Sequence, residues 1–246
     1  MKKSIIIIIV IVGLYLFLAI YGFDYIDAIF HKNIYIGDTR WEYSNGKWID
    51  SSSKISNGLK LSNYYIYKQN TWEYVGRYDM KYNNNWYIRS KNGYAKYNFP
   101  LFAYKGSGIK LYNFDTEYNV DKSKVNAILK KANISKYSSL NLSKSIKFDV
   151  DNDGLDETIY VLSNVYSQNE EPILFSIVAL EDNGEYKIIK SITKKEEEML
   201  NIFAIIDVDG DKNLELVIAK EIFSCGNTYE LYGLKDGKYV KLISTE

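Results

Sequence analysis

The sequence predicts a mainly β protein with a minor α content. We expect an N-terminal transmembrane helix, an aromatic antiparallel β meander, one connector helix and two β repeats built around acidic loops. Three observations support this prediction. Tyr occurs 24 times in 246 residues and aromatic residues reach 15%, which favours strands. Short alternating runs are separated by turn residues, and one acidic pattern occurs twice before a strand. The expected domains are a signal anchor at 1–27, an aromatic β domain at 28–118 and a repeat domain at 119–246.

The charge balance and the rare residues exclude several functions. The chain has 31 Lys and Arg against 31 Asp and Glu, so it has no overall field to attract nucleic acid, and we expect no nucleic-acid partner. Its single histidine, His31, excludes a His cluster for zinc and leaves no spare base for a Ser or Cys nucleophile. The lone Cys225 cannot form an intramolecular disulfide. These counts favour a protein that is not an enzyme.

The apolar segment at residues 5–23 contains nineteen uncharged residues. As a helix rising about 1.5 Å per residue it would cover roughly the 30 Å hydrocarbon core of a membrane. Lys2 and Lys3 precede the segment, whereas Asp24 and Asp27 follow it, so the positive-inside rule places the N-terminus in the cytoplasm. The sequence therefore predicts a single-pass cell-membrane protein with an extracellular C-terminal domain.

A cleaved signal peptide is the alternative interpretation of the same segment. Signal peptides usually have an apolar region of about 7–15 residues that ends in an A-x-A-like site. The residues at 20–22, Ile-Tyr-Gly, match that site poorly. The sequence favours an uncleaved anchor and leaves cleavage open.

The segment from residue 33 to residue 118 contains all four tryptophans and fourteen of the tyrosines. Asn45 and Gly46 predict a type I′ turn between the runs at 41–43 and 47–49. Four more strand-like runs follow, at residues 64–67, 72–82, 86–89 and 94–99. The aromatic side chains fit the core and cross-strand pairs of an antiparallel sheet, although an exposed set could also stack on glycan rings.

A helical pattern interrupts the strands at residues 121–132. Val125, Ile128, Leu129 and Ala132 recur at helical spacing behind a polar start. We expect this helix to connect the meander to the repeats.

Two acidic loops, 58 residues apart, contain the most specific chemical pattern in the chain. Carboxylates stand at relative positions 1, 3, 5 and 9, and a backbone carbonyl at position 7 can complete a shell of oxygen ligands around one hard cation. The carboxylates are Asp149, Asp151, Asp153 and Glu157 in the first loop and Asp207, Asp209, Asp211 and Glu215 in the second; the carbonyls are those of Leu155 and Asn213.

The loops are not EF-hands, because position 12 holds Tyr160 and Ile218 instead of Glu and the flanks alternate like strands. The pattern D-x-D-x-D-G-x-x-[DE] before a strand resembles the calcium loop of FG-GAP and VCBS-type repeats, which occur in integrin-like propellers and bacterial surface proteins. The resemblance implies Ca²⁺ at the carboxylates of both loops. Lys212 replaces the position-6 glycine, so we expect the second site to be weaker.

The repeat extends beyond the loops. Residues 180–186 match residues 234–239, each a hairpin turn before a final strand, so two units cover about residues 146–244. Two units cannot close a propeller, which needs at least about four blades. We expect a pair of small packed sheets.

These observations predict a membrane-anchored, extracellular, calcium-binding β module without catalytic activity. Its expected partner is a cell-wall glycan or a surface protein. The alternative is a surface glycan hydrolase, which would need a carboxylate pair about 5–10 Å apart in a cleft. A third possibility is an accessory subunit that contacts its partner through the membrane helix.

Overall fold

The computed structural model describes most of the chain from residue 32 onward. The described residues are 32–36, 39–50, 58–68, 71–82, 86–90, 93–97, 101–104, 109–135, 137, 139–165, 174–193, 198–208, 210–222 and 226–245. The protein is mainly β, as predicted, with three antiparallel sheets and one helix in this part of the chain. The chain forms two compact units, residues 1–68 with 73–109 and residues 69–72 with 110–246. The domain boundaries expected from the sequence stay predictions.

An eight-stranded sheet forms the first unit, in the order β3-β2-β1-β8-β4-β5-β6-β7. The sheet is not a simple meander, because β8 lies between β1 and β4 and pairs antiparallel with both. Its strands are β1 (Lys32–Ile36), β2 (Thr39–Ser44), β3 (Lys47–Asp50), β4 (Gly58–Lys68), β5 (Thr71–Tyr82), β6 (Trp86–Ser90), β7 (Gly93–Tyr97) and β8 (Leu101–Tyr104).

The hairpin between β2 and β3 has the turn that the sequence predicts. Asn45 and Gly46 both have positive φ angles, of 52° and 74°, which is the conformation of a type I′ turn. Trp41 is fully buried, and the Tyr43 and Trp48 rings face each other across the strands with their centroids 5.4 Å apart. Local turn chemistry and cross-strand aromatic pairing therefore both favour this hairpin.

The predicted single-pass membrane location is wrong. In the part of the chain that the structure describes, no helix combines the length and the apolar character needed to cross a membrane. The described helix has ten residues, which cover about 15 Å, or half of the hydrocarbon thickness. The apolar segment at 5–23, on which that prediction rested, lies outside the described residues.

The second unit contains two five-stranded antiparallel sheets. The first has the order β10-β11-β12-β13-β14 and the second has the order β18-β17-β16-β15-β9. Each sheet is a four-stranded meander with one short strand added at its edge. The strands are β9 (Lys110–Tyr112), β10 (Glu117–Tyr118), β11 (Leu142–Phe148), β12 (Glu157–Asn164), β13 (Phe175–Asp182), β14 (Glu185–Thr193), β15 (Glu198–Asp207), β16 (Glu215–Ile222), β17 (Gly226–Lys235) and β18 (Lys238–Ser244).

The two meanders repeat each other in detail. The turns before their last strands have paired positive φ angles, 49° and 78° at residues 183–184 and 50° and 70° at residues 236–237. A register shift interrupts the last pairing of each meander, between Val178 and Ala179 in the first and between Leu231 and Tyr232 in the second. The two turns are 53 residues apart in the sequence, and so are the two register shifts. The sequence repeat is therefore also a structural repeat.

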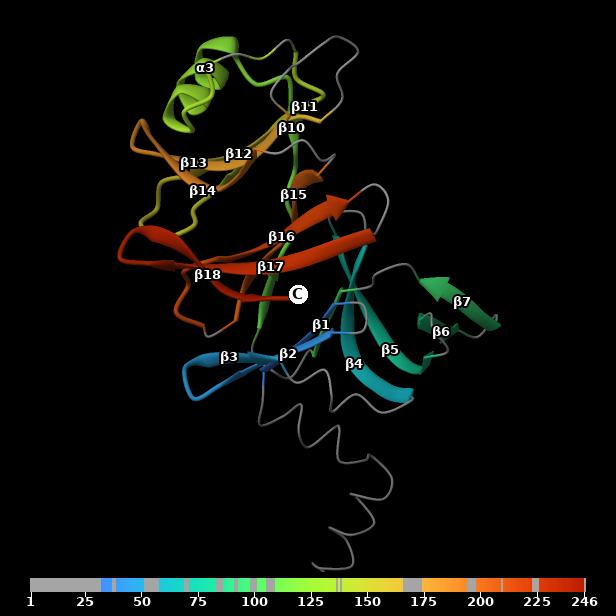
Figure 1. The fold of residues 1–246 in the computed structure, drawn as a ribbon. Coiled ribbons are helices and arrows are strands. Elements are labelled where there is room, and N and C mark those ends of the chain that lie inside the picture. The colour runs from blue at the N-terminus through green and yellow to red at the C-terminus, as the bar shows by residue number, and fades with distance from the viewer. Residues whose placement is uncertain are drawn as a thin grey trace, which may run out of the picture. The chain divides into compact units, whose positions relative to one another are not determined.

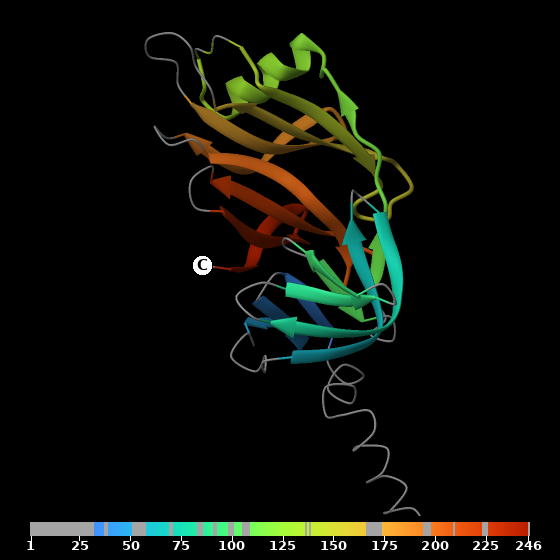
Figure 2. The same cartoon turned by 90° about the vertical axis from the view of Figure 1, so that its right-hand side faces the viewer.

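The connector helix α3 (Lys122–Lys131) forms where the sequence predicts it. Asp121 caps its N-terminus by accepting a hydrogen bond from the Ser123 N–H at 2.7 Å. Figures 1 and 2 show α3 lying over the first sheet, with the second sheet as the third layer of this unit. Two sheets packed in this way agree with the pair expected from the sequence.

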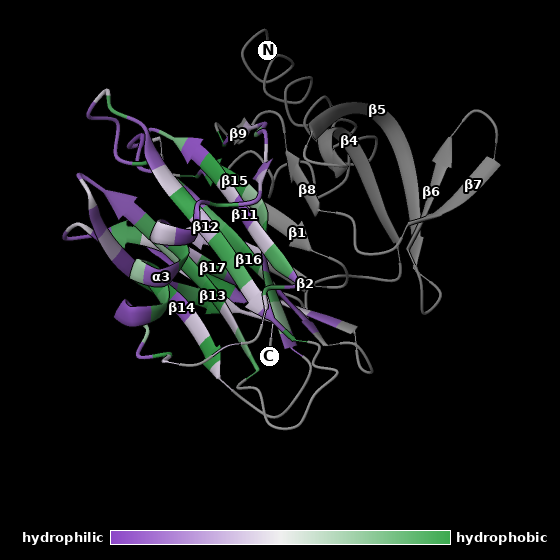
Figure 3. Ribbon diagram, turned by 90° about the horizontal axis from the view of Figure 1, so that it is seen from above, coloured by the Kyte–Doolittle hydropathy of each residue, from purple (hydrophilic) through white to green (hydrophobic). Residues whose placement is uncertain are grey.

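The apolar face of α3 forms one core with the outer face of the first sheet. Val125, Ile128 and Leu129 are buried against side chains of β12 and β13, among them Leu162 and Ile177. Figure 3 shows apolar residues along strands such as β12 and β16, whereas hydrophilic residues cover the outer side of α3. Because α3 occupies the face where a third sheet would stack, it ends the array of repeats on this side.

Polar contacts also join the two sheets. The Leu200 N–H of β15 donates a hydrogen bond of 2.8 Å to Ser176 Oγ of β13. Lys190 of β14 forms a largely buried ion pair with Glu230 of β17. Glu230 also accepts a hydrogen bond of 2.8 Å from the Tyr232 hydroxyl, so its charge is well compensated.

We expect Glu230→Gln to destabilise the protein by about 1–3 kcal/mol at pH 7, the cost typical of a buried charged hydrogen bond. Burial tends to raise the pKa of Glu230, but Lys190, Tyr232 and Lys241 together hold it below its usual value of 4.5. A lowered carboxyl pKa stabilises the fold above pH 4.5, and this stabilisation disappears as the pH falls through the folded pKa. Urea unfolding at several pH values should therefore show a difference from wild type that shrinks in acid.

The exposed Glu185 of β14 supplies the control. Glu185→Gln should unfold like wild type at each pH. A constant difference between Glu230→Gln and wild type from pH 7 to pH 3 would contradict the assigned role of the ion pair.

Candidate metal centre

Each acidic loop closes a hairpin at the start of its meander. The first loop connects β11 to β12, and the second connects β15 to β16. The register pairs Phe148 with Glu157 and Ile206 with Glu215, so the position-9 glutamate begins the returning strand in both repeats. The strand pairing thus brings the residue before position 1 opposite position 9 in both loops.

The backbones of the two loops share an unusual conformation. Position 4 has a positive φ in both loops, 60° at Asn152 and 84° at Gly210, and so does position 6, at 90° for Gly154 and 74° for Lys212. Asn and Gly adopt this region readily, whereas a lysine does so at a cost of roughly 1 kcal/mol. The chain therefore keeps the loop conformation at Lys212 despite an unfavourable residue.

The position-9 glutamate holds each loop together. The Val150 N–H donates to Glu157 Oε2 at 2.8 Å, and the Val208 N–H donates to Glu215 Oε2 at 2.9 Å. Both glutamates are buried. Each loop is thus closed by the same hydrogen bond between positions 2 and 9.

Three carboxylates converge in the first loop. Asp149, Asp151 and Asp153 each offer one carboxylate oxygen, and these oxygens lie within 4.8 Å of one another. Backbone amides orient them: the N–H groups of Asp153 and Gly154 donate to the two oxygens of Asp149, both at 3.1 Å. Like charges at this spacing repel, so the loop brings together carboxylates that a cation would stabilise.

Glu157 lies outside this group of three but interacts with it electrostatically. Burial raises its pKa, and the charges of Asp151, Asp153 and Asp182 raise it further, against the lowering effect of the Val150 N–H. The position-7 residue, Leu155, is exposed, and its N–H donates to Asp153 Oδ1 at 2.8 Å. Three of the five predicted ligand positions of this loop therefore form a close cluster, whereas Glu157 lies outside it and Leu155 contacts it through its N–H.

The second loop compensates its charges with protein groups. Asp207 is completely buried, and its Oδ1 accepts a hydrogen bond of 2.7 Å from the Gly210 N–H. Its Oδ2 has no hydrogen-bond partner among the described residues but lies 3.5 Å from Lys110 Nζ of β9. Both oxygens of Asp211 accept hydrogen bonds from Asn213, at 2.7 and 2.8 Å.

The loops consequently differ in how well they fit a cation. Asp209, the predicted position-3 ligand of the second loop, lies outside the described residues. Lys110 was not found by sequence analysis, because it is almost one hundred residues away from Asp207 and only the β9–β15 pairing brings them together. The oxygen donors of the first loop fit a hard cation, whereas the second loop already has a lysine ammonium at its position-1 carboxylate.

The two loops lie side by side. The Leu214 N–H of the second loop donates to the Val150 carbonyl of the first at 2.8 Å. The Tyr239 hydroxyl donates to the Leu214 carbonyl, also at 2.8 Å. Burial strongly raises the pKa of Tyr239, with further contributions from Glu215, Glu157 and Asp151, so this hydroxyl stays protonated between the loops.

Comparison with known proteins gives no match: no family model, no curated protein and no solved structure corresponds to the chain.

We expect Lys110→Met to destabilise the protein by about 1–3 kcal/mol in the presence of a chelator, because the buried Asp207 loses its counter-charge. Millimolar calcium should remove most of the difference from wild type, since the second loop can then take a cation in place of the ammonium group. Thermal unfolding of wild type and of Lys110→Met, in chelator and in calcium, measures this difference in stability.

The exposed Lys130 of α3 offers a matched control, and Lys130→Met should change neither measurement. A difference between Lys110→Met and wild type that calcium leaves unchanged would show that a cation cannot take the place of Lys110.

Proposed function

We propose that the second unit is a calcium-stabilised, non-catalytic binding module. In the first loop, Asp149, Asp151, Asp153 and Glu157 would hold Ca²⁺, together with the carbonyl of Leu155. The observation that carries this proposal is the convergence of three carboxylate oxygens within 4.8 Å. Hydrogen bonds from backbone amides orient Asp149 and Asp151, which supports a site that begins from these three aspartates.

Ligand chemistry favours calcium over other cations. All the proposed donors are oxygens, which suit Ca²⁺, Mg²⁺ and Mn²⁺ better than softer metals. Calcium accepts six to eight oxygen ligands in irregular shells, whereas magnesium requires a near-octahedral shell and loses its waters reluctantly. A loop with four carboxylates and a backbone carbonyl matches the wider shell.

The second loop is proposed as the weaker site. Lys110 places one positive charge beside Asp207, and position 6 of this loop is a second lysine, Lys212, in place of glycine. Asp211 is also engaged with Asn213 through both of its oxygens. Calcium would therefore bind the first loop preferentially. Because the Leu214 N–H donates to the Val150 carbonyl, calcium binding to the first loop would also stabilise the conformation of the second.

We also propose that the two repeats are of the FG-GAP/VCBS-like kind. Two features support the assignment. Each repeat is a four-stranded antiparallel meander with its acidic loop between the first and second strands. The loops share positive φ angles at positions 4 and 6 and the hydrogen bond between positions 2 and 9. In this assignment calcium has a structural role and the surfaces beside the sheets bind a partner, a glycan polymer or a protein.

The direct test is the thermal unfolding of the 246-residue chain in calcium, in magnesium and in chelator. At a hundredfold excess over its dissociation constant, calcium should stabilise the protein by about 2.7 kcal/mol. This corresponds to a rise of several degrees in the melting temperature for a domain of this size. Magnesium should give a clearly smaller rise.

Identical melting curves in calcium and chelator would contradict the metal assignment.

Incubation of the same protein with polysaccharides tests the absence of catalysis. Bond cleavage that is lost when one carboxylate outside the two loops is replaced would favour the glycan hydrolase instead.

A further inference from the structure

Two adjoining cavities lie along the edge strand β10, and each is lined by a residue that flanks the first acidic loop, Thr158 in one and Phe148 in the other. One has a volume of about 210 Å³ and extends toward α3, and the other has a volume of about 340 Å³ and extends toward residues 113–115. Glu117, Ser145 and Lys147 line both cavities, so the two are consecutive parts of one depression. Together they reach the range of about 300–1,000 Å³ that is typical of ligand sites.

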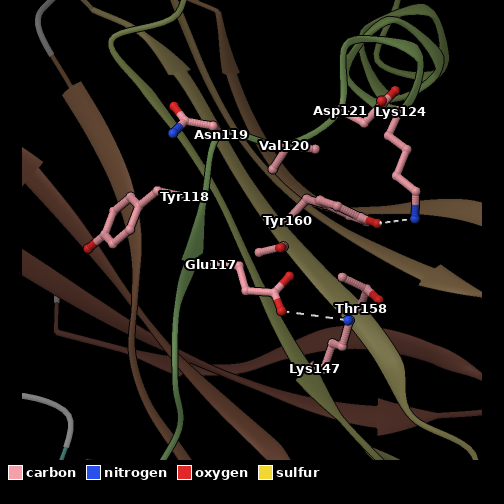
Figure 4. Close-up of a pocket in the computed structure, with 10 residues that line it drawn as sticks. Glu117, Tyr118, Asn119, Val120, Asp121, Lys124, Lys147, Thr158 and Tyr160 are labelled. Atoms are coloured by element: carbon pink, nitrogen blue, oxygen red, sulfur yellow. Dashed lines mark hydrogen bonds and ion pairs between the residues drawn. The ribbon is translucent and has the colours of Figure 1, made fainter.

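The walls of the first cavity are polar. Of its ten lining residues, Val120 alone has a purely aliphatic side chain. Figure 4 shows Glu117, Lys147, Thr158 and Tyr160 on the same side of β10. Carboxylates accept hydrogen bonds, ammonium groups donate them and hydroxyls do both. This mixture suits a ligand that carries many hydroxyl groups.

The charges of the first cavity are compensated within the protein. Lys124 Nζ lies 2.8 Å from Glu181 Oε2 and 2.9 Å from the Tyr160 hydroxyl. Lys147 Nζ lies 3.7 Å from Glu117 Oε1. Each of the two lysines that line this cavity thus has a carboxylate partner, and this balance favours a ligand without net charge over an anion.

The shared wall is accessible and only loosely tied. The side chains of Glu117 and Lys147 are 70% and 59% exposed, and an exposed pair at 3.7 Å contributes little to stability. A ligand can therefore exchange this contact for hydrogen bonds of its own at small cost. By contrast, Lys124 donates partly buried hydrogen bonds to both Glu181 and Tyr160, and a ligand would not readily replace them.

Tyr118 adds an aromatic surface beside the polar one. It is 66% exposed, and in Figure 4 its ring lies on the opposite side of β10 from Glu117 and Lys147. Because β10 has two residues, a ligand longer than one ring could cross it and contact both surfaces. The combination of an exposed aromatic ring with dense hydrogen-bonding groups suits sugar rings.

We propose that this depression along β10 binds a neutral oligosaccharide, with Glu117 and Lys147 as hydrogen-bonding residues and Tyr118 as a stacking surface. The proposal deepens the function proposed above, since it names the surface and the class of ligand of the binding module.

Calorimetric titration of the 246-residue chain in calcium with cellotetraose, chitotetraose and maltotetraose tests this proposal. We expect at least one of these tetrasaccharides to bind. Glu117→Gln and Tyr118→Ala should each weaken that binding about tenfold or more, the loss expected for one good contact. Glu185→Gln, on the exposed edge strand β14, should bind like wild type.

Several outcomes would overturn the proposal: no binding of any of the three probes, equal binding by the Glu117 and Tyr118 variants, or binding of inorganic phosphate in place of the sugars. The calcium-dependent melting shift, measured on the same samples, separates this proposal from the metal assignment. A protein that keeps the calcium-dependent melting shift but binds no sugar would contradict the saccharide proposal and leave the metal assignment intact.

Discussion

The repulsion among three aspartates in the first loop is the constraint on which the rest of this unit depends. One carboxylate oxygen each of Asp149, Asp151 and Asp153 lies within 4.8 Å of the others, in a loop that is oriented by backbone amides and closed by the pairing of β11 with β12. The fold therefore concentrates negative charge at the point where its first hairpin turns. In the proposed calcium-bound form, the cation would convert this repulsion into attraction and would make the loop a crosslink between two strands.

The second loop has the same backbone conformation, but a lysine of the protein lies beside its first carboxylate. The closing hydrogen bond and the positive φ angles are kept, but the ammonium group of Lys110 lies beside the buried Asp207. The two loops are joined through Leu214 and Val150, and α3 covers the outer face of the first sheet. Two repeats can thus form a stable pair without the closed ring of a propeller.

Sequence reasoning succeeded where the signal is local. The turn at residues 45–46 and the helix at 121–132 follow from nearest-neighbour chemistry, and the structure has both. It failed where distant segments meet. Nothing in the pattern around 101–104 indicates that this strand enters the middle of the first sheet, and no local motif pairs Lys110 with Asp207. Hydropathy and the flanking charges also led to a membrane location that the described helix does not support.

The most direct test of the central claim compares Asp151→Asn with Asp156→Asn by thermal unfolding in chelator and in calcium. Asp156 is an exposed residue of the same loop outside the proposed ligand set, so both variants remove one charge from one loop. Asp151→Asn should melt above wild type in chelator, because it relieves repulsion, and below wild type in calcium, because it removes a ligand. Asp156→Asn should keep the full calcium shift. Equal calcium shifts in the two variants would contradict the claim that the clustered aspartates hold the cation.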